Sequence, residues 1–182
     1  MRIPRREYLL NGKTIILRSP EPEDAQTFLD VRIKTSEESY NMARYPEEMV
    51  NPIENIPPML TLTLQSDNEF LIGAFDGDKM IGCVGVAKYG THIKYRHKLG
   101  LGISILKDYC NGGLGTAMME YAVESAKQTD IEQLLLGVYD DNERAQHLYK
   151  KMGFVEWGRE PRAFKHKDDT YHDEIQMVLM LK

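Results

Sequence analysis

Seven residues, Cys110-Asn111-Gly112-Gly113-Leu114-Gly115-Thr116, separate a predicted strand from the most clearly amphipathic helix of this 182-residue chain. Glycines permit backbone conformations that other residues avoid, and they let a ligand approach the main chain closely. The start of the following helix offers unpaired N–H groups and the positive end of the helix dipole, which together suit a phosphate group. A strand-to-helix turn without a ligand can use the same glycines, so the turn alone leaves both interpretations open.

Two common phosphate-binding motifs do not fit these letters. A Walker P-loop requires Gly-Lys before Ser or Thr at the helix start, and Gly115-Thr116 lacks the lysine. A Rossmann dinucleotide fingerprint requires a third small residue after Gly113 and Gly115, where this chain has Met118. Asp130 has about the separation of a ribose-binding acid, but it precedes the next predicted strand rather than ending it. Both motifs are therefore disfavoured.

The sequence around the turn predicts alternating strands and helices. Apolar and β-branched residues predict seven strands, at 14–18, 69–75, 80–88, 99–106, 133–138, 154–164 and 171–181. Apolar residues at helical spacing predict helices at 25–33, 59–65, 114–126 and 142–152. The alternating leucines of 59–65 also fit a strand, but the length and position of this segment favour a helix. This order predicts a mixed sheet with helices packed on it.

Local signals refine the prediction at three places. Asp76-Gly77-Asp78-Lys79 is typical of a hairpin turn between two strands. Gly100 and Gly102 interrupt the strand at 99–106, which indicates a bulge or a close backbone approach. The segment 36–58 is polar and rich in proline, and we expect a connection with short helical pieces there.

Composition limits the class of protein. A length of 182 residues without repeats or linkers predicts one domain, 1–182. The net charge of −5 disfavours a general nucleic-acid binder, and no apolar run reaches the roughly 20 residues of a membrane span. Cys83 and Cys110 suit neither a disulfide framework nor a zinc site. The start of the chain is basic, but Asn11-Gly12 interrupts its apolar run, so we expect a cytoplasmic protein without a signal peptide.

The glycine turn resembles motif A of the GNAT superfamily of N-acetyltransferases, R/Q-x-x-G-x-G/A, with Cys110 in the Arg/Gln position and Gly113 and Gly115 in the two small positions. Motif B of that family, V-x-x-x-N-x-x-A-x-x-x-Y-x-x-x-G-F, is similar to Val138, Asn142, Ala145, Tyr149 and Gly153-Phe154 in order and register. Further similarities are Ile15-Leu17-Arg18 and Pro22-Glu23-Asp24, which resemble the first strand and helix start of the family.

The resemblance implies an α/β (α+β) GNAT fold, with a mixed, mostly antiparallel sheet of six to seven strands and flanking helices. It implies an enzyme that uses acetyl-CoA as a co-substrate and no metal. Main-chain groups of the strand would meet the pantetheine and the oxyanion, the turn would hold the pyrophosphate, and Asn142 would lie near the pantetheine arm or cap its helix. The implied cofactor-binding residues are Ile103, Ser104, Ile105, Leu106, Cys110, Asn111, Gly112, Gly113, Leu114, Gly115, Thr116, Asn142 and Tyr149.

Catalysis requires a neutral amine, a stabilised oxyanion and a proton for the departing sulfur. Tyr149 occupies the family's tyrosine position facing the sulfur and is the candidate acid; packing alone is the alternative role for it. Gly100 stands where relatives often have a glutamate base. His97, Glu69, Glu174 or a chain of water molecules remain alternatives for the base.

The predicted closing hairpin, 158–164 with 171–174, resembles acetyltransferases of the ribosomal-protein and polyamine type. Tyr171, Asp173 and Glu174 are therefore candidates to bind the acceptor, a small-molecule amine or a peptide N-terminus. We expect no nucleic-acid or membrane partner, and a homodimer stays open. A non-catalytic acetyl-CoA-binding protein of the same fold is the main alternative function, ahead of a nucleotide-dependent enzyme.

Overall fold

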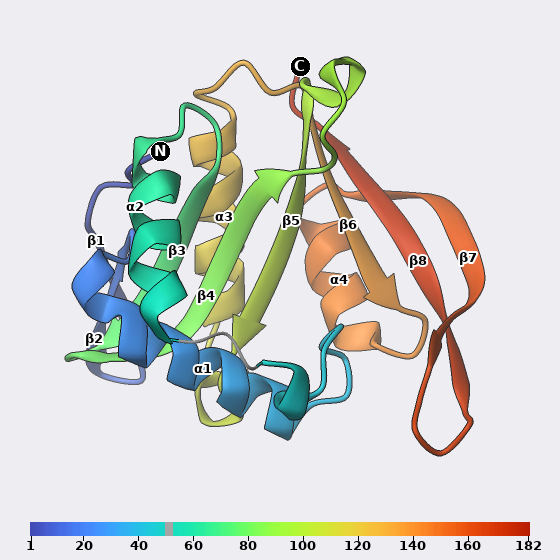
Figure 1. Ribbon diagram of the computed structural model, residues 1–182, viewed down its shortest axis with the longest axis horizontal. Helices are drawn as coiled ribbons and strands as arrows, with labels where there is room; N and C mark the ends of the chain where they lie inside the picture. Colours follow the sequence, from blue (N-terminus) through green and yellow to red (C-terminus); the bar gives the residue numbers. More distant parts are fainter. Residues whose placement is uncertain (50–52) are drawn as a thin grey trace.

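An eight-stranded sheet runs through the molecule in the computed structural model, which describes residues 1–49 and 53–182 (Figure 1). The strands are β1 (Arg6–Leu10), β2 (Lys13–Arg18), β3 (Phe70–Asp76), β4 (Lys79–Lys88), β5 (Lys98–Ile105), β6 (Gln133–Tyr139), β7 (Val155–Lys165) and β8 (Tyr171–Met180). Their order in the sheet is β1-β2-β3-β4-β5-β6-β8-β7. Only β5 and β6 pair in parallel, so the predicted mixed and mostly antiparallel sheet is confirmed.

Four α-helices cover the sheet: α1 (Ala25–Glu38), α2 (Ile56–Gln65), α3 (Leu114–Ala126) and α4 (Glu143–Lys151). Figure 1 shows α1 and α2 in front of the sheet and α3 behind it. The core between these layers holds large side chains with almost no exposed surface, among them Phe70, Phe75, Met118 and Phe154. The segment 59–65 is thus helical, as predicted from its length; α2 starts at Ile56 and carries prolines in its first turn.

The sheet has one strand more than the six to seven predicted. β1 was missed, although Asn11 and Gly12 connect it to β2 through a two-residue turn with φ of 49° and 81°. Asn-Gly in such a turn is a strong hairpin signal, because both residues tolerate positive φ. The predicted connection 36–58 contains the short helical turns Pro46–Glu48 and Ile53–Asn55, while residues 50–52 lie outside the described part of the chain.

β5 and β6 separate soon after they begin to pair. Their register contains only Lys98 with Gln133, Leu99 with Leu134 and Gly100 with Leu135. Pairing of β5 with β4 continues unbroken as far as Ile105. The bulge predicted at Gly100 and Gly102 is therefore wrong for this ladder, and the two glycines instead mark the place where the neighbouring strand departs.

Both cysteines are free. Cys83 is buried on β4, and burial raises the pKa of its thiol to about 12. Within residues 1–49 and 53–182, no helix is long and apolar enough to cross a membrane.

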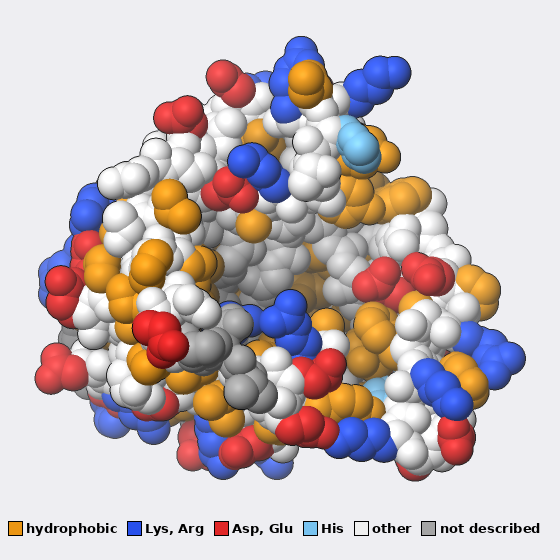
Figure 2. Space-filling view, viewed as in Figure 1, with side chains coloured by type: hydrophobic (Ala, Val, Ile, Leu, Met, Phe, Trp, Pro, Cys, Tyr) orange, Lys and Arg blue, Asp and Glu red, His pale blue; other side chains and the backbone are white. Residues whose placement is uncertain are grey.

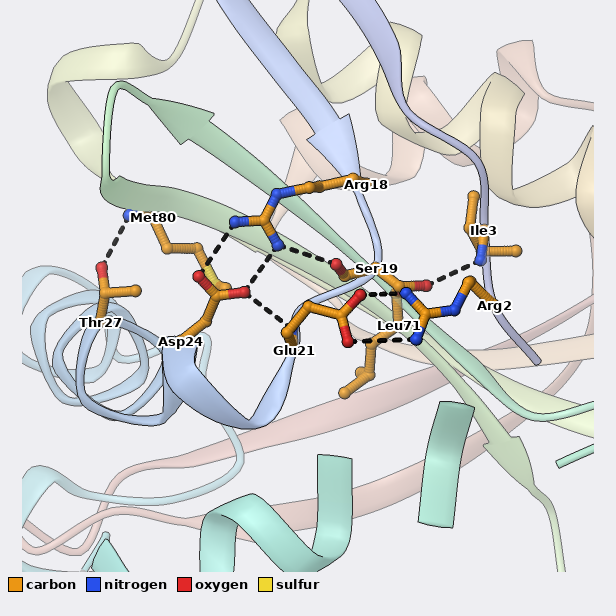
Figure 3. A network of polar contacts seen from close by, with 9 residues as sticks. All are labelled: Arg2, Ile3, Arg18, Ser19, Glu21, Asp24, Thr27, Leu71 and Met80. Carbon is orange, nitrogen blue, oxygen red and sulfur yellow. Dashed lines mark hydrogen bonds and ion pairs between the residues drawn. The ribbon is translucent and has the colours of Figure 1, made fainter. Parts of the chain in front are cut away.

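A polar network fixes the junction between β2 and α1 (Figure 3). The guanidinium of Arg18 donates to both carboxylate oxygens of Asp24, at 2.6 and 3.0 Å, and the backbone N–H of Glu21 donates to the same carboxylate at 2.7 Å. Burial disfavours ionisation of Asp24, but these hydrogen bonds outweigh it and hold the pKa of Asp24 below its usual value. Nearby, the hydroxyl of Thr27 accepts from the Met80 N–H at 2.7 Å and ties α1 to β4.

We predict that Asp24→Asn lowers the free energy of unfolding at pH 7 by about 1–2 kcal/mol, because a charged acceptor is lost from two strong hydrogen bonds. A group with a lowered folded-state pKa stabilises the protein above its unfolded pKa of about 3.9, and this contribution disappears as the pH falls through the folded value. Urea unfolding at pH 7 and at pH 3 should therefore show a smaller deficit at pH 3 than at pH 7. Asp30→Asn is the control, since exposed Asp30 contacts only Gln26 on the surface of α1. An equal deficit at both pH values would contradict the electrostatic origin.

Candidate active site

A cleft of about 980 Å³ opens where β5 and β6 diverge. Figure 2 shows the hollow on the face seen in Figure 1, with basic side chains below it and acidic side chains to its right. Its walls include residues of α1, β4, β5, β6 and β8, the start of α3, and α4 along its length. The predicted residues that line it are Ile103, Ser104, Ile105, Cys110, Asn111, Gly113, Gly115, Thr116, Asn142, Tyr149 and Glu174.

The glycine turn forms the start of α3. Gly113 precedes the helix with φ of 83°, and Asn111 has φ of 67°. No side chain caps the helix, so its first N–H groups keep their hydrogen-bonding capacity for another partner. Gly115 lies where three elements meet, because a Cβ there would be 3.5 Å from side-chain atoms of Ile105 and of Leu148. The turn thus combines free donors, the helix dipole and space for an anion.

The β1 hairpin supports this turn from the side away from the cleft. The Tyr8 hydroxyl donates to the Gly112 carbonyl at 2.9 Å. A Cβ on Gly112 would come within 2.2 Å of the Leu10 side chain, and one on Gly113 within 2.7 Å of the Tyr8 hydroxyl. Gly112 therefore packs against β1 and does not line the cleft. The resemblance had implied a place for it among the cofactor-binding residues. Because β1 was not predicted, no pattern in the sequence connected Tyr8 with the turn.

Two more of the implied cofactor-binding residues have buried side chains. Leu106 and Leu114 are buried in the core and do not line the cleft. Cys110 lines it, but its thiol points back to the end of β5, with Sγ 3.5 Å from the Leu106 carbonyl oxygen. A thiol is a weak donor, so the polar contact of the Arg or Gln found in relatives is not replaced by Cys110.

Asn142 and Tyr149 come from α4. The Asn142 side-chain oxygen accepts from the Ala145 N–H at 3.1 Å, so its predicted role as a helix N-cap is confirmed, and its amide N–H groups remain available at the cleft. Tyr149 is 7% exposed. Burial raises the pKa of its phenol to about 12, so the hydroxyl is un-ionised at neutral pH. Tyr149 thus presents a neutral donor beside the cleft.

The unpaired edge of β5 is the third feature of the cleft. Ile103, Ser104 and Ile105 pair with β4 on one side, and on the other side no strand of the described chain faces them. Backbone groups on such an edge need water or a ligand as partners.

Of the acidic candidates, Glu174 is the one placed in the cleft. It lies over Gly137, where a Cβ would come within 2.1 Å of its carboxylate. A second hollow of about 440 Å³ adjoins the cleft, and Glu174 lines both. Its one polar partner in the described chain is the Gln176 amide at 3.4 Å. Glu69 instead accepts from the Lys88 N–H at 2.9 Å, away from the cleft.

Three predicted site residues, His97, Tyr171 and Asp173, do not line the cleft. His97 stands at the start of β5, where its carbonyl accepts from the Glu132 N–H at 2.8 Å. The Asp173 carboxylate binds the Arg162 N–H at 2.8 Å and the Arg159 guanidinium at 3.2 Å. Tyr171 lies under the Arg162 guanidinium, 3.9 Å from its ring centre. The positions of Tyr171 and Asp173 follow from the alternation of side chains along β8, because these two residues point to the opposite face from Glu174.

A group of possible metal ligands stands near the rim: Asp140, Asp141 and His172 have ligand atoms within 4.8 Å of one another. These atoms already have partners in the fold. The imidazole of His172 is 3.1 Å from Asp140, and the Tyr40 hydroxyl donates to Asp141 at 2.6 Å.

The comparisons with known proteins agree on acetyltransferases. A family model described as the acetyltransferase (GNAT) family matches residues 29–154. The chain is 27% identical over 105 residues to N-alpha-acetyltransferase 30 of Schizosaccharomyces pombe, which covers 57% of this chain and 69% of that protein. The structure of a GNAT-family acetyltransferase from Streptococcus pneumoniae superposes with a TM-score of 0.87 at 28% identity, covering 92% of this chain and 99% of the other.

A more distant structure shares the fold and was solved with a bound molecule. This is yncA from Salmonella typhimurium, with its cofactor acetyl-CoA, at a TM-score of 0.81 and 12% identity, covering 92% of this chain and 94% of yncA.

We predict that Gly113→Ala weakens binding of coenzyme A by roughly tenfold or more, because the strained turn moves and its N–H groups lose their alignment. The same strain lowers the free energy of unfolding by about 1–2 kcal/mol. Gly77→Ala is the matched control: Gly77 also has positive φ, 62°, but a Cβ there meets nothing within 4 Å. Calorimetric titration and urea unfolding should show that both variants lose stability and only Gly113→Ala loses affinity. Equal affinity of the two variants would remove the turn from the binding site.

Proposed function

Because this chain belongs to the acetyltransferase (GNAT) family, we propose that it transfers the acetyl group of acetyl-CoA to a primary amine of a small molecule or a protein N-terminus. One observation carries the proposal: residues of the uncapped start of α3, residues of the unpaired edge of β5, and Tyr149 all line one cleft. Each supplies one requirement of the reaction, namely an anion site, a row of backbone partners and a donor for a sulfur atom. We treat residues 1–182 as the one domain that performs it.

In this proposal acetyl-CoA lies extended along the cleft. The turn from Cys110 to Thr116 would hold the pyrophosphate through main-chain N–H groups. The pantetheine amides would then pair with the free edge of β5, as an added strand does, and the amide of Asn142 would meet the same arm. Backbone N–H groups at the end of β5 would stabilise the oxyanion.

We propose direct attack in a ternary complex. The amine nitrogen forms a bond to the thioester carbonyl carbon, and the carbonyl oxygen becomes an oxyanion. Collapse of this intermediate breaks the C–S bond, releases the thiolate and forms the amide. In the balanced reaction, one proton leaves the nitrogen and one proton reaches the sulfur.

Tyr149 would serve the sulfur. A phenol with a pKa of about 12 stays neutral and donates a hydrogen bond to the thiolate as its charge develops. A simple thiol has a pKa near 8.5, so the thiolate is a weaker base than the phenolate of Tyr149. The raised pKa therefore supports hydrogen-bond stabilisation of the thiolate more directly than complete proton transfer.

Glu174 would serve the amine. An alkyl ammonium has a pKa near 10 and must lose a proton before the nitrogen can attack. The cleft is lined by two carboxylates, Glu38 and Glu174, and Glu38 already accepts from the Lys107 N–H at 2.7 Å. Glu174 also stands opposite Glu160 on β7, and like charges in this arrangement disfavour each other. An ammonium between them would relieve that repulsion, so we assign Glu174 to bind the amine and pass on its proton.

The test is acetyl transfer to a panel of amines, followed through the release of free coenzyme A thiol. We predict that Tyr149→Phe lowers kcat by roughly 10- to 100-fold, because one hydrogen bond to a charged group is lost in the transition state. The KM for acetyl-CoA should stay nearly constant. Tyr121→Phe is the matched control, since the Tyr121 hydroxyl is also buried but donates to the Pro4 carbonyl, outside the cleft. Unchanged turnover in Tyr149→Phe would remove Tyr149 from the mechanism.

Binding of acetyl-CoA without turnover of any amine would support the alternative, a non-catalytic protein of the same fold. Stabilisation by NAD or ATP and not by coenzyme A would overturn both.

A further inference from the structure

Arg32, on α1, lines the cleft without an acidic partner. Among residues 1–49 and 53–182, no ion pair or hydrogen bond reaches its guanidinium, which lies over the Phe28 ring with Cζ 5.5 Å from the ring centre. Glu38 lines the same side of the cleft but is held by the Lys107 N–H. A half-buried arginine with five donors and no acceptor is costly to maintain unless a ligand supplies one.

The surroundings make this position more unfavourable for a cation. Burial lowers the pKa of Arg32, and the neighbouring positive charge of Arg44 lowers it further, while the nearby thiol of Cys83 acts in the opposite direction. Two guanidinium groups close together without an anion between them repel each other. An anionic ligand would offset both the burial of the Arg32 charge and its repulsion by Arg44.

Glu174 stands on the other side of the opening. Arg32 belongs to α1, which packs on β4 and β5, whereas Glu174 belongs to β8, beyond β6. The gap between β5 and β6 lies between these two groups. Gly85, Gly102 and Gly137 are among the strand residues that line the cleft there, and a Cβ on Gly102 would meet nothing within 4 Å. The cleft therefore offers a cation on one wall, an anion on the opposite wall and free space between.

We propose that Arg32 binds a carboxylate of the acceptor, so that the acceptor is a small molecule that carries both an amine and a carboxylate, an amino acid in chemical terms. The inference rests on the proposed acetyl transfer and adds the second half of the acceptor. Glu174 takes the ammonium end, and Arg32 takes the acid end through the planar, two-pronged contact that guanidinium groups make with carboxylates. A phosphate of acetyl-CoA is the other anion that could reach a cleft arginine, and it already has a site at the start of α3.

The experiment compares free acids with their methyl esters as acceptors. Amino acids of increasing amine-to-acid distance are offered with saturating acetyl-CoA, each beside its methyl ester, which keeps the amine and loses the negative charge. For the preferred acceptor, kcat/KM of the acid should exceed that of the ester by roughly 10- to 100-fold in the wild-type protein.

Arg32→Gln should lower kcat/KM for the acid by about the same factor, leave the ester nearly unchanged and leave the KM for acetyl-CoA unchanged. Arg32→Lys should recover part of the preference for the acid, because it restores the charge without the planar fork. Arg144→Gln is the matched control: Arg144 lines the cleft from α4 and should keep the wild-type ratio of acid to ester. Urea unfolding of each variant confirms that it is folded.

Esters or simple amines that are acetylated as fast as the acids would overturn this inference and leave the proposed acetyl transfer intact. A higher KM for acetyl-CoA in Arg32→Gln, with an unchanged ratio of acid to ester, would assign Arg32 to the coenzyme and overturn it too. Failure to acetylate any amine would overturn the proposed function itself.

Discussion

Parallel hydrogen bonding between β5 and β6 stops at Gly100 and Leu135, while β5 continues to pair with β4 as far as Ile105. Buried backbone donors and acceptors cost free energy when they lack partners, so an edge left open inside a sheet must be served by water or by a ligand. The other parts of the site are arranged around this edge. α3 begins beside its end, α4 brings Asn142 and Tyr149 to it, and β8 brings Glu174.

Local sequence carried the prediction of the glycine turn and of the cap of α4, because their geometry is set by short-range rules. Gly113 must adopt positive φ before α3, and Asn142 caps α4 through a residue three positions later. The residues of β8 that line the cleft were predicted less well. Tyr171 and Asp173 were grouped with Glu174 by proximity in sequence, although the two-residue period of a strand places them on the other face. The alternation of side chains along a strand can be read from the sequence and would have separated Glu174 from Tyr171 and Asp173. Asn11-Gly12 likewise indicates a hairpin and would have predicted β1.

Arg32 belongs to a different class. Nothing in the sequence around it distinguishes it from the other arginines of the chain. Arg32 is distinguished only in the fold, where no acidic side chain of the described residues pairs with it. Pairing of a charge depends on residues distant in sequence. Arg18, by contrast, meets Asp24 six residues later and is fully engaged in the junction of β2 and α1. Arg18 at the end of β2 therefore has a structural role, whereas we propose that Arg32 on α1 faces a ligand.

The contact between Tyr8 and the glycine turn has a consequence for inheritance. The hydroxyl of Tyr8 and the missing side chain of Gly113 fit each other, although 105 positions separate them in the chain. A larger residue at 113 meets the Tyr8 hydroxyl and is strained at a φ of 83° as well, so a smaller residue at position 8 removes only part of its cost. A change at position 8 alone leaves the Gly112 carbonyl without its donor. Which residues are accepted at one of these positions should therefore depend on the other as the sequence diverges.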